Sequence, residues 1–181
     1  MKILLFAALV PLFASLPVMA QEHISVLTED SIQAFVDDSA ALTDPDNGMS
    51  DEDIRSFLDT HLKADGAYKS VITYEIPGYP PQARQVSLNK EDFIQNVIEG
   101  RNALEDYAAD VRINSTEIEK DGQQANIRTR TTETGRMPFQ DGAMVPFEGT
   151  SICTQGLSLN PQGQVVLSTA DCRTTITILE D

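Results

Sequence analysis

The two cysteines of the chain constrain its fold more than any other feature. Cys153 and Cys172 lie in two β-rich runs, 149–159 and 165–178, which flank the turn sequence Asn-Pro-Gln-Gly. Such runs around a Pro/Gly turn predict a β-hairpin. With an even loop over 161–164, the two cysteines face each other directly. Directly opposed residues have Cα atoms about 4.5–5.5 Å apart, which a disulfide can span, so we predict a Cys153–Cys172 disulfide.

The loop of this hairpin has an alternative form. A three-residue loop with a bulge at Gly163 shifts the pairing by one residue and separates the cysteines onto opposite faces, unless a second bulge compensates. The even loop places Ile152, Val165 and Leu167 on the face opposite the cysteines, among mostly polar residues. It gives the cysteine face these apolar residues: Leu157, Leu159, Val166, Ala170, Ile176 and Ile178. We expect a half-buried pair of strands in a larger sheet.

The N-terminus indicates export. Lys2 precedes an apolar stretch over 3–16, and Val18-Met19-Ala20 provides a cleavage site before the polar Gln21. An uncleaved membrane anchor is the alternative, but Pro11, Pro17 and the lack of basic residues after the site favour cleavage. We therefore predict a signal peptide over 1–20 and a periplasmic or secreted protein. A disulfide persists in such an oxidising compartment.

Charge and length limit the class of protein. The formal net charge is −15, and an acidic surface repels phosphate backbones and anionic lipid headgroups. We therefore expect no nucleic-acid partner and, after cleavage, no membrane partner. The mature length suits one domain, predicted over 28–181 after a mobile N-terminus over 21–27.

The first half of the chain predicts helices. Thr28 and Ser50 are N-cap residues for two helices that end near residues 42 and 64–66. Asn89 caps a third and longest helix. Its apolar stripe consists of Phe93, Val97, Gly100, Leu104, Tyr107 and Val111.

The strands complete the element order. A strand over 68–76 and a short returning strand over 84–87 precede the longest helix. Strands over 112–119 and 124–134 form a hairpin about Asp121-Gly122, and the cysteine hairpin follows. Helices followed by runs of strands predict an α+β architecture, with helices on one face of a mainly antiparallel sheet.

This order resembles the nuclear transport factor 2-like superfamily, the cone-shaped, cystatin-like fold that also includes SnoaL-like and ketosteroid-isomerase-like proteins. The most similar residues are Leu62-Lys63-Ala64-Asp65-Gly66-Ala67-Tyr68 and Val86-Ser87-Leu88-Asn89-Lys90-Glu91-Asp92-Phe93, and the order of elements matches over about 28–178. The resemblance implies a curled sheet wrapped around a long helix, with a pocket at the open end of the cone. Members include isomerases, cyclases, epoxide hydrolases and ligand-binding domains. A homodimer through the outer sheet face is common among them.

The resemblance also directs attention to residues of the cone. Members resembling ketosteroid isomerases use a buried Tyr and carboxylates; this chain has Tyr68 and Tyr74 on one strand face but no matching Asp pair, so we assign no catalytic residue. Tyr68, Tyr74 and Phe93 are core or pocket-wall residues and candidates for ligand binding. Arg128 and Arg130 share a strand face, where they cradle an acidic ligand or pair with Asp/Glu on the outer sheet.

Metal and cofactor chemistry find no support in the residue pattern. The acidic run over 44–53 fails the EF-hand register, because Gly48 falls at position 5 of the loop and Arg55 at position 12. A helix stop, a turn and the acidic first turn of the next helix explain this run. His23 and His61 are isolated, so no zinc set or Cys–His nucleophile is expected. We expect no metal and no cofactor.

Two functions remain. The first is an exported, non-catalytic module that binds a small molecule or a protein partner, in the cone pocket or on the sheet face. The alternative is a cone-pocket enzyme of the isomerase or cyclase type. A buried carboxyl with a raised pKa beside a Tyr or His favours the enzyme, whereas an apolar or filled interior favours the module.

Overall fold

The computed structural model describes residues 24–139 and 142–180, so the predicted signal peptide and residues 21–23 lie outside the described residues. Within them the helices are α1 (Glu29–Ala41), α2 (Asp51–His61) and α3 (Lys90–Ala103), with a short 3-10 helix, η1 (Pro45–Asn47), between α1 and α2. The strands are β1 (Leu62–Glu75), β2 (Gln82–Leu88), β3 (Glu105–Ile118), β4 (Gln124–Pro138), β5 (Met144–Leu159) and β6 (Val165–Ile178).

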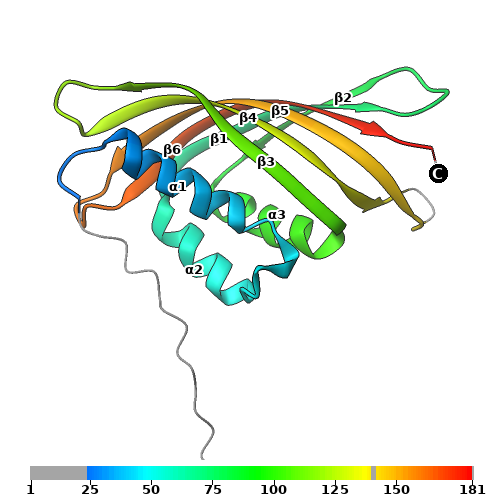
Figure 1. The fold of residues 1–181 in the computed structure, drawn as a ribbon, viewed down its shortest axis with the longest axis horizontal. Helices are drawn as coiled ribbons and strands as arrows, with labels where there is room; N and C mark the ends of the chain where they lie inside the picture. The colour runs from blue at the N-terminus through cyan, green and yellow to red at the C-terminus, as the bar shows by residue number, and fades with distance from the viewer. Residues whose placement is uncertain (1–23, 140–141, 181) are drawn as a thin grey trace, which may run out of the picture.

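One curled sheet holds all six of these strands, in the order β2-β1-β6-β5-β4-β3. Neighbouring strands are antiparallel except β1 and β6, which run parallel. The three helices lie together on one face of the sheet, and its other face is uncovered (Figure 1). The predicted α+β class with a mainly antiparallel sheet is confirmed.

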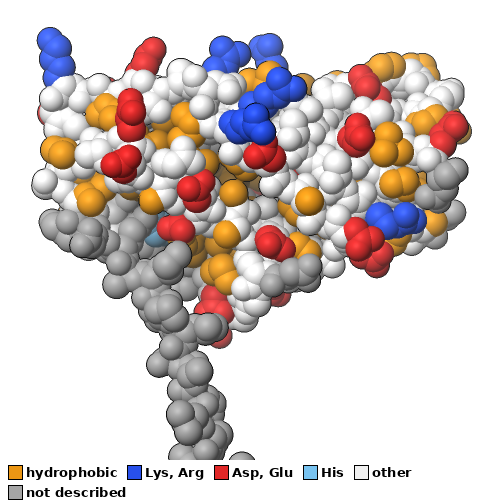
Figure 2. Space-filling view, in the orientation of Figure 1, with side chains coloured by type: hydrophobic (Ala, Val, Ile, Leu, Met, Phe, Trp, Pro, Cys, Tyr) orange, Lys and Arg blue, Asp and Glu red, His pale blue; other side chains and the backbone are white. Residues whose placement is uncertain are grey.

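Positively and negatively charged side chains are distributed unevenly over the surface of the molecule. Most of the Lys and Arg side chains visible in Figure 2 gather at its upper edge, over the sheet, while Asp and Glu side chains are spread across the rest of that view. The chain has 28 Asp and Glu residues and 13 Lys and Arg residues, so this cluster of cationic side chains lies on a protein that is acidic as a whole.

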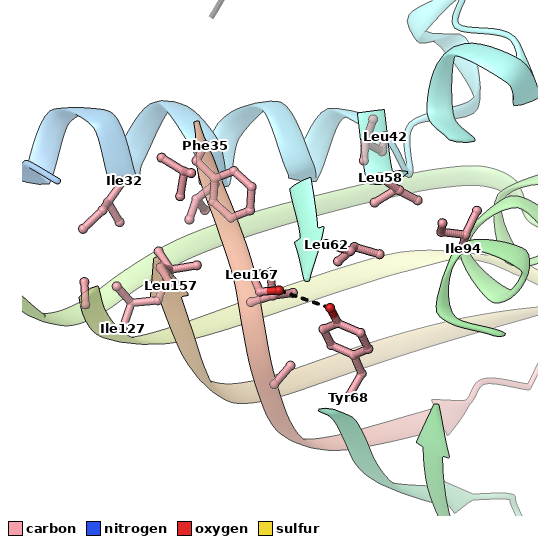
Figure 3. Close-up of a cluster of buried hydrophobic side chains, with 14 of the residues drawn as sticks. Ile32, Phe35, Leu42, Leu58, Leu62, Tyr68, Ile94, Ile127, Leu157 and Leu167 are labelled. Carbon is pink, nitrogen blue, oxygen red and sulfur yellow. Dashed lines mark hydrogen bonds between the residues drawn. The ribbon is translucent and has the colours of Figure 1, made fainter. Parts of the chain in front are cut away.

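The core lies between the helices and the inner face of the sheet. Ile32 and Phe35 of α1 and Ile94 of α3 face Ile127 of β4 and Leu167 of β6 in one buried cluster (Figure 3). Each such side chain contributes about 1.5–3 kcal/mol by leaving water. This apolar contact holds the helices against the sheet.

The predicted helix starts are confirmed. Thr28 and Ser31 form a capping box at α1, and Ser50 and Asp53 form another at α2, with Asp53 in place of the usual Glu. The carboxylate of Asp53 accepts hydrogen bonds from Ser50, which lower the pKa of Asp53. The acidic run over 44–53 therefore includes a capped helix start.

The third helix is shorter than predicted. It ends at Ala103, because Leu104 is extended and Asp106 has a φ of 51°. Tyr107 and Val111, assigned by their spacing to the helix, lie instead on β3. The separation of four between Tyr107 and Val111 suits a strand as well as a helix, and packing against the sheet decides for the strand.

The buried face of α3 also differs from the predicted stripe. Ile94, Ile98 and Arg101 are its buried residues, while Phe93 and Val97 are half-buried. Gly100 is exposed, and a Cβ at this position would meet nothing within 4 Å, so it permits no close approach to the sheet. The true stripe is rotated by about one residue from the predicted one.

The cysteine hairpin has the alternative loop, so the predicted even loop is wrong. Asn160 and Gln164 flank a three-residue loop, and Gly163 takes a φ of 73°. A second irregularity then restores the register, because Leu157 pairs with Leu167 but Gly156 pairs with Thr169. As a result Cys153 still faces Cys172, and a disulfide joins them with a Cα–Cα distance of 4.1 Å.

The same two bulges change which residues face inward near the turn. Val165 and Leu167 pair with Leu159 and Leu157, and both are buried. The even loop had placed Val165 and Leu167 on the opposite face and Val166 on the cysteine face. The shift therefore adds two apolar side chains to the core.

Residues 24–27, part of the stretch over 21–27 that the sequence predicts to be mobile, are hydrogen-bonded to two turns of the sheet. The Ile24 amide donates to the Gly163 carbonyl at 3.1 Å, and the Leu27 amide donates to the Gly122 carbonyl at 2.7 Å. The Leu27 side chain is buried. This segment thus crosses the turns that join β3 to β4 and β5 to β6.

Candidate functional site

A cavity of about 240 Å³ lies between the helices and the inner face of the sheet. All three α-helices and strands β1 and β3 to β6 contribute to its wall, and most of the lining side chains are apolar. The helical lining residues are Phe35, Val36, Ser39, Ala40, Phe57, Leu58, His61, Phe93 and Val97. The remaining lining residues are Leu42, Thr43, Leu62, Tyr107, Ala109, Val111, Thr129, Thr131, Cys153, Gln155 and Leu167.

His61 is the most distinctive polar residue of this wall. It ends α2, and only 5% of its surface is exposed. Its ring packs against Phe57 at a centroid distance of 4.3 Å and against Phe35 at 5.8 Å. Burial lowers the pKa of His61, so the imidazole is neutral at pH 7.

The tautomer of His61 follows from its hydrogen bond. Nδ1 lies 2.7 Å from the Val165 carbonyl oxygen, which can only accept, so we assign the proton to Nδ1. Nε2 is then a hydrogen-bond acceptor. Within 24–139 and 142–180, no hydrogen bond to Nε2 is present, and a buried acceptor without a partner is uncommon.

Two further polar side chains line the same cavity. Thr129 of β4 is 2% exposed, and Gln155 of β5 is half-buried. Neither side chain makes a hydrogen bond to another of the described residues. Together with His61, and with the hydroxyls of Ser39, Thr43, Tyr107 and Thr131, they provide donors and acceptors in a mostly apolar wall.

Tyr107 carries the only hydroxyl of the lining that contacts a carboxylate among the described residues. Its Oη donates to Glu133 Oε2 at 2.8 Å. Burial, and then the neighbouring negative charge of Glu133, raise the pKa of Tyr107 well above its usual value. The tyrosine is therefore protonated at pH 7, and Glu133 itself is not part of the cavity wall.

A second carboxyl lies near the site. Burial raises the pKa of Asp38 on α1, while the neighbouring His61 opposes the rise. Asp38 is half-buried, and it does not line the cavity. A carboxyl with a raised pKa thus lies near a histidine but outside the wall.

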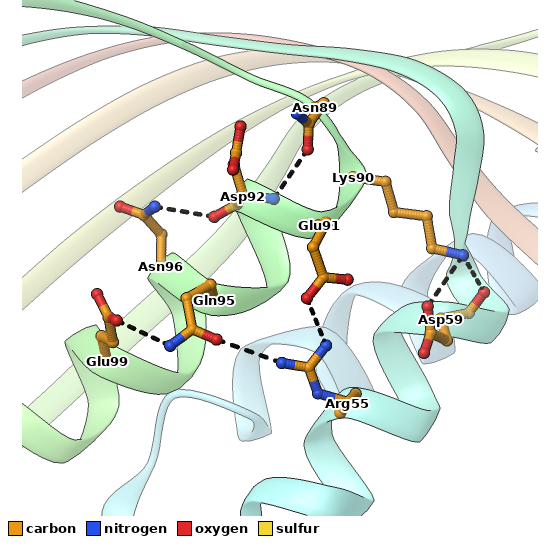
Figure 4. A network of polar contacts seen from close by, with 9 residues as sticks. All are labelled: Arg55, Asp59, Asn89, Lys90, Glu91, Asp92, Gln95, Asn96 and Glu99. Carbon is orange, nitrogen blue, oxygen red and sulfur yellow. Dashed lines mark hydrogen bonds and ion pairs between the residues drawn. The ribbon is translucent and has the colours of Figure 1, made fainter.

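Polar contacts fix the helices that form the wall. Arg55 of α2 contacts Glu91 of α3 at 2.8 Å, and Lys90 of α3 donates to the Asp59 carbonyl of α2 at 2.6 Å (Figure 4). The carboxylates of Glu91 and Asp59 are more than half exposed, so these contacts contribute more to orientation than to stability. Arg101, which is buried, donates to the carbonyl oxygens of Asp44 and Pro45 and so holds the loop between α1 and α2.

The predicted ligand-binding residues separate into three places. Phe93 lines the cavity, and Tyr68 packs beside it at a ring distance of 4.9 Å without lining the cavity. The Tyr68 hydroxyl lies 3.1 Å from the Leu167 carbonyl and 3.2 Å from the Lys63 carbonyl, and burial raises its pKa to about 12. Tyr74 is half-buried on the inner face of β1, outside the cavity wall.

Arg128 and Arg130 lie on the outer face of the sheet. They alternate along β4 with the inward-facing Ile127 and Thr129, and both guanidinium groups are exposed. The sequence predicts that these arginines either cradle an acidic ligand or pair with Asp or Glu on this face. No ion pair to Arg128 or Arg130 is present in the part of the chain that the structure describes, so they share the predicted face but lack the predicted partners.

Sequence reasoning did not assign the polar residues of the wall to a ligand. His61 lies among apolar residues of α2, and its contact with Val165 spans a sequence separation of 104 residues. Thr129 follows the inward Ile127 by two residues, so alternation along the strand was the signal that it faces inward.

Neither a metal site nor a membrane-spanning helix is found in the described parts of the chain. No group of three or more His, Cys, Asp or Glu residues there could hold a metal ion. No helix over 24–139 and 142–180 is long and apolar enough to cross a membrane.

No protein-family model matches the sequence, and no curated protein matches it either. Solved structures do match. A conserved protein from Planctomyces limnophilus is 14% identical, with a TM-score of 0.54 over 83% of this chain and 97% of that one. A type 2 hexachlorocyclohexane dehydrochlorinase is 11% identical, with a TM-score of 0.55 over 83% and 88% of the two chains.

The chain has the nuclear transport factor 2-like fold. The nuclear transport factor 2-like cone predicted from the order of elements is confirmed as a fold. Sequence identities this low give no information about the activity of the chain.

Proposed function

We propose that this chain is an exported, non-catalytic binding module that holds a small, mainly apolar molecule in the cone cavity. The observation that carries the proposal is the Nε2 of His61, which has no hydrogen-bond partner among the described residues and lies in a wall of mostly apolar side chains. Ligand pockets are typically apolar, with a few polar groups that fix orientation. The cavity has this composition.

The polar groups limit the chemistry of the ligand. Neutral His61 presents an acceptor at Nε2, so the ligand carries a hydroxyl or an N–H that donates to it. Thr129 can donate or accept, and it suits a second oxygen or nitrogen of the ligand. A ligand without a donor leaves the buried Nε2 unsatisfied, at a cost of about 1–3 kcal/mol.

The size of the cavity limits the ligand further. At about 240 Å³ it is larger than the cavity of about 150 Å³ that holds benzene in another protein. It is smaller than the range of about 300–1,000 Å³ that is usual for drug-sized ligands. A substituted single ring or a short branched chain fits these limits.

Phenol and toluene form a matched pair of probes, because they share a ring and differ in the donor. Calorimetric titration of the purified chain should show tighter binding of phenol, by about tenfold for a difference of about 1.4 kcal/mol. His61→Phe should remove this preference while keeping an aromatic ring at the site. Tyr74→Phe, outside the cavity wall, is the control and should keep it. Equal affinity for both probes in the unaltered chain would refute the donor requirement.

A second candidate is a cone-pocket enzyme of the isomerase or cyclase type. The carboxyl of Asp38 has a raised pKa and neighbours His61, an arrangement that favours proton transfer. Against it, neither Asp38 nor Glu133 lines the cavity, where a base must reach its substrate. The apolar wall therefore supports the binding module more strongly.

Proton transfer is measurable without knowing the substrate. Cyclohexanone in deuterated water exchanges its α-hydrogens when a base and an acid act on it, and mass spectrometry follows the exchange. If the chain is a binding module, hydrogen exchange in its presence should be no faster than in the presence of the His61→Phe variant. Acceleration that both His61→Phe and Asp38→Asn abolish would favour the enzyme.

A further inference from the structure

A row of arginines crosses the outer face of the sheet. Arg173 of β6 pairs with Ile152 of β5, Ile152 with Arg130 of β4, and Arg130 with Arg112 of β3. Val71 of β1 pairs with Arg173 and continues the row at its other end. We call these five residues the outer arginine row.

The row is exposed and mostly unpaired. Arg112 contacts Asp110 at 2.7 Å, but no ion pair to Arg130 or Arg173 is present in the described part of the chain. Ile152 is 40% exposed and Val71 is 39% exposed, and both are among the few large apolar side chains that remain in solvent. The helices lie on the opposite face of the sheet, so no described element covers the row (Figure 1).

The row next to it adds further positive charge. Lys69, Asp171, Thr154 and Arg128 pair in succession across β1, β6, β5 and β4. Lys69 and Arg128 make no ion pair with another described residue. Five of the 13 cations of an acidic chain thus lie in two adjacent rows, with Asp110 and Asp171 as their neighbouring carboxylates.

We propose that the outer arginine row docks a segment of another protein in which carboxylates flank an apolar side chain. Guanidinium groups bind carboxylates through paired hydrogen bonds, and Arg is enriched at protein interfaces. Ile152 lies between Arg173 and Arg130, on strands about 4.8 Å apart. An apolar side chain on Ile152 therefore brings its flanking carboxylates to the two arginines.

Other occupants fit this surface less well. A second copy that docked by two-fold symmetry would bring one arginine row against another, and like charges in contact are costly. A uniform polyanion has no apolar group to pack against Ile152 and Val71. It is also repelled by the acidic residues of the rest of the chain. At physiological salt, charges more than about 8–10 Å apart are largely screened from each other. A short acidic segment bound at the outer arginine row therefore interacts mainly with the charges of the row.

The test uses a short fluorescent peptide in which Asp and Ile occupy alternate odd positions with Ser between them, so that all of these side chains lie on one face of an extended segment. Its binding to the purified chain is measured by fluorescence anisotropy. Binding should weaken as salt rises, because exposed charges are screened. Arg130→Gln with Arg173→Gln should weaken binding by about tenfold or more, as for central interface residues. Arg84→Gln with Lys120→Gln removes the same charge from exposed sites outside the row and should leave binding unchanged. Thermal melting establishes that both variants are folded.

Matched peptides separate the two parts of the proposal. A peptide with Asn in place of Asp should lose binding, and one with Ser in place of Ile should bind more weakly. If the Ser peptide or heparin bound as tightly as the Asp–Ile peptide, the outer arginine row would be a general anion site and not a site for the proposed segment. No binding of the Asp–Ile peptide, or self-association of the chain that the Arg130/Arg173 variant abolishes, would overturn the proposal.

Discussion

At the scale of single residues, burial decides the protonation of His61. The imidazole is neutral in the folded chain because its pKa is lowered by burial, although its hydrogen bond to Val165 and the charge of Asp38 partly oppose this. In the unfolded chain the pKa returns to about 6.5. The unfolded chain therefore binds a proton at a higher pH than the folded chain does.

This difference predicts how stability depends on pH. As the pH falls below about 6.5, the unfolded state gains a proton at His61 first, so the free energy of unfolding decreases until the pH reaches the lower pKa of the folded state. Urea unfolding between about pH 7 and pH 5 should show this decrease, and His61→Phe should reduce the slope. Asp38, whose folded pKa is raised, has the opposite sign, so Asp38→Asn should make the decrease steeper. An unchanged slope in His61→Phe would mean that His61 is not neutral and buried.

Single residues also show how much of the structure could be predicted from the sequence. The Cys153–Cys172 pair was predictable, because strand pairing restricts which residues can meet. The role of His61 was not, because its partner Val165 and the aromatic ring of Phe35 are brought to it only by the packing of helices on the sheet. Arg128 and Arg130 were correctly placed on one strand face, but their lack of ion pairs depends on neighbouring strands.

At the scale of elements, the cysteine hairpin compensates for its own loop. The bulge at Gly163 shifts the pairing by one residue, and the irregularity at Gly156–Leu157 shifts it back before the cysteines. A sequence pattern cannot easily reveal two compensating bulges, since each alone would invert the faces of the strand. Packing of Val165 and Leu167 into the core stabilises the observed register.

The disulfide should stabilise this hairpin without being required for the fold. Its two cysteines are separated by 19 positions, and closing a loop of this size contributes about 3 kcal/mol in the chain-entropy model. Cys153→Ala with Cys172→Ala should lower the melting temperature but leave the far-ultraviolet circular dichroism unchanged. Thiol titration of the unaltered, unreduced chain should detect no free thiol. Two free thiols would contradict the pairing of β5 with β6.

The third helix offers a matched pair of substitutions. Ile94 is fully buried in the core, and Ile94→Ala should lower the free energy of unfolding by about 2–5 kcal/mol. Glu99 is exposed and accepts one hydrogen bond from Gln95, so Glu99→Ala should change stability little. Chemical denaturation of both variants measures the difference. Similar effects would show that the buried face of α3 is assigned wrongly.

The prediction of an extended third helix had a physical cause. Apolar residues at Leu104, Tyr107 and Val111 satisfy helical spacing, and the separation of four between Tyr107 and Val111 also suits one face of a strand. The backbone of Asp106, with its positive φ, makes the turn between the two elements. Pairing with β4 then decides the outcome, and this contact is remote in sequence.

At the scale of the whole molecule, the order of elements was enough to predict the cone. Helices followed by strands leave few ways to cover one face of a sheet, which explains why the α+β class and the fold were predictable. The cavity was not predictable in detail, because its volume depends on how side chains from all three helices meet the sheet. The outer face, left free by this arrangement, holds the outer arginine row.

Export remains a prediction for the whole chain. We expect the mature protein to begin at Gln21, because the stretch over 3–16 and the Val18-Met19-Ala20 site have the pattern of a cleaved signal peptide. Intact-mass measurement of secreted or periplasmic material should show the loss of residues 1–20. Retention of these residues in a membrane fraction would contradict the prediction.

The central claim is that a small molecule with a hydrogen-bond donor occupies the cone and donates to His61 Nε2. Nitrogen-15 NMR of the imidazole rings tests it most directly, since the chain has only two histidines and the His61→Phe chain assigns the signals. On saturation with phenol, we predict that the Nε2 resonance of His61 moves in the direction of a newly accepted hydrogen bond, and that toluene does not produce this shift. A His61 Nε2 resonance that stays unchanged while phenol binds would contradict the account.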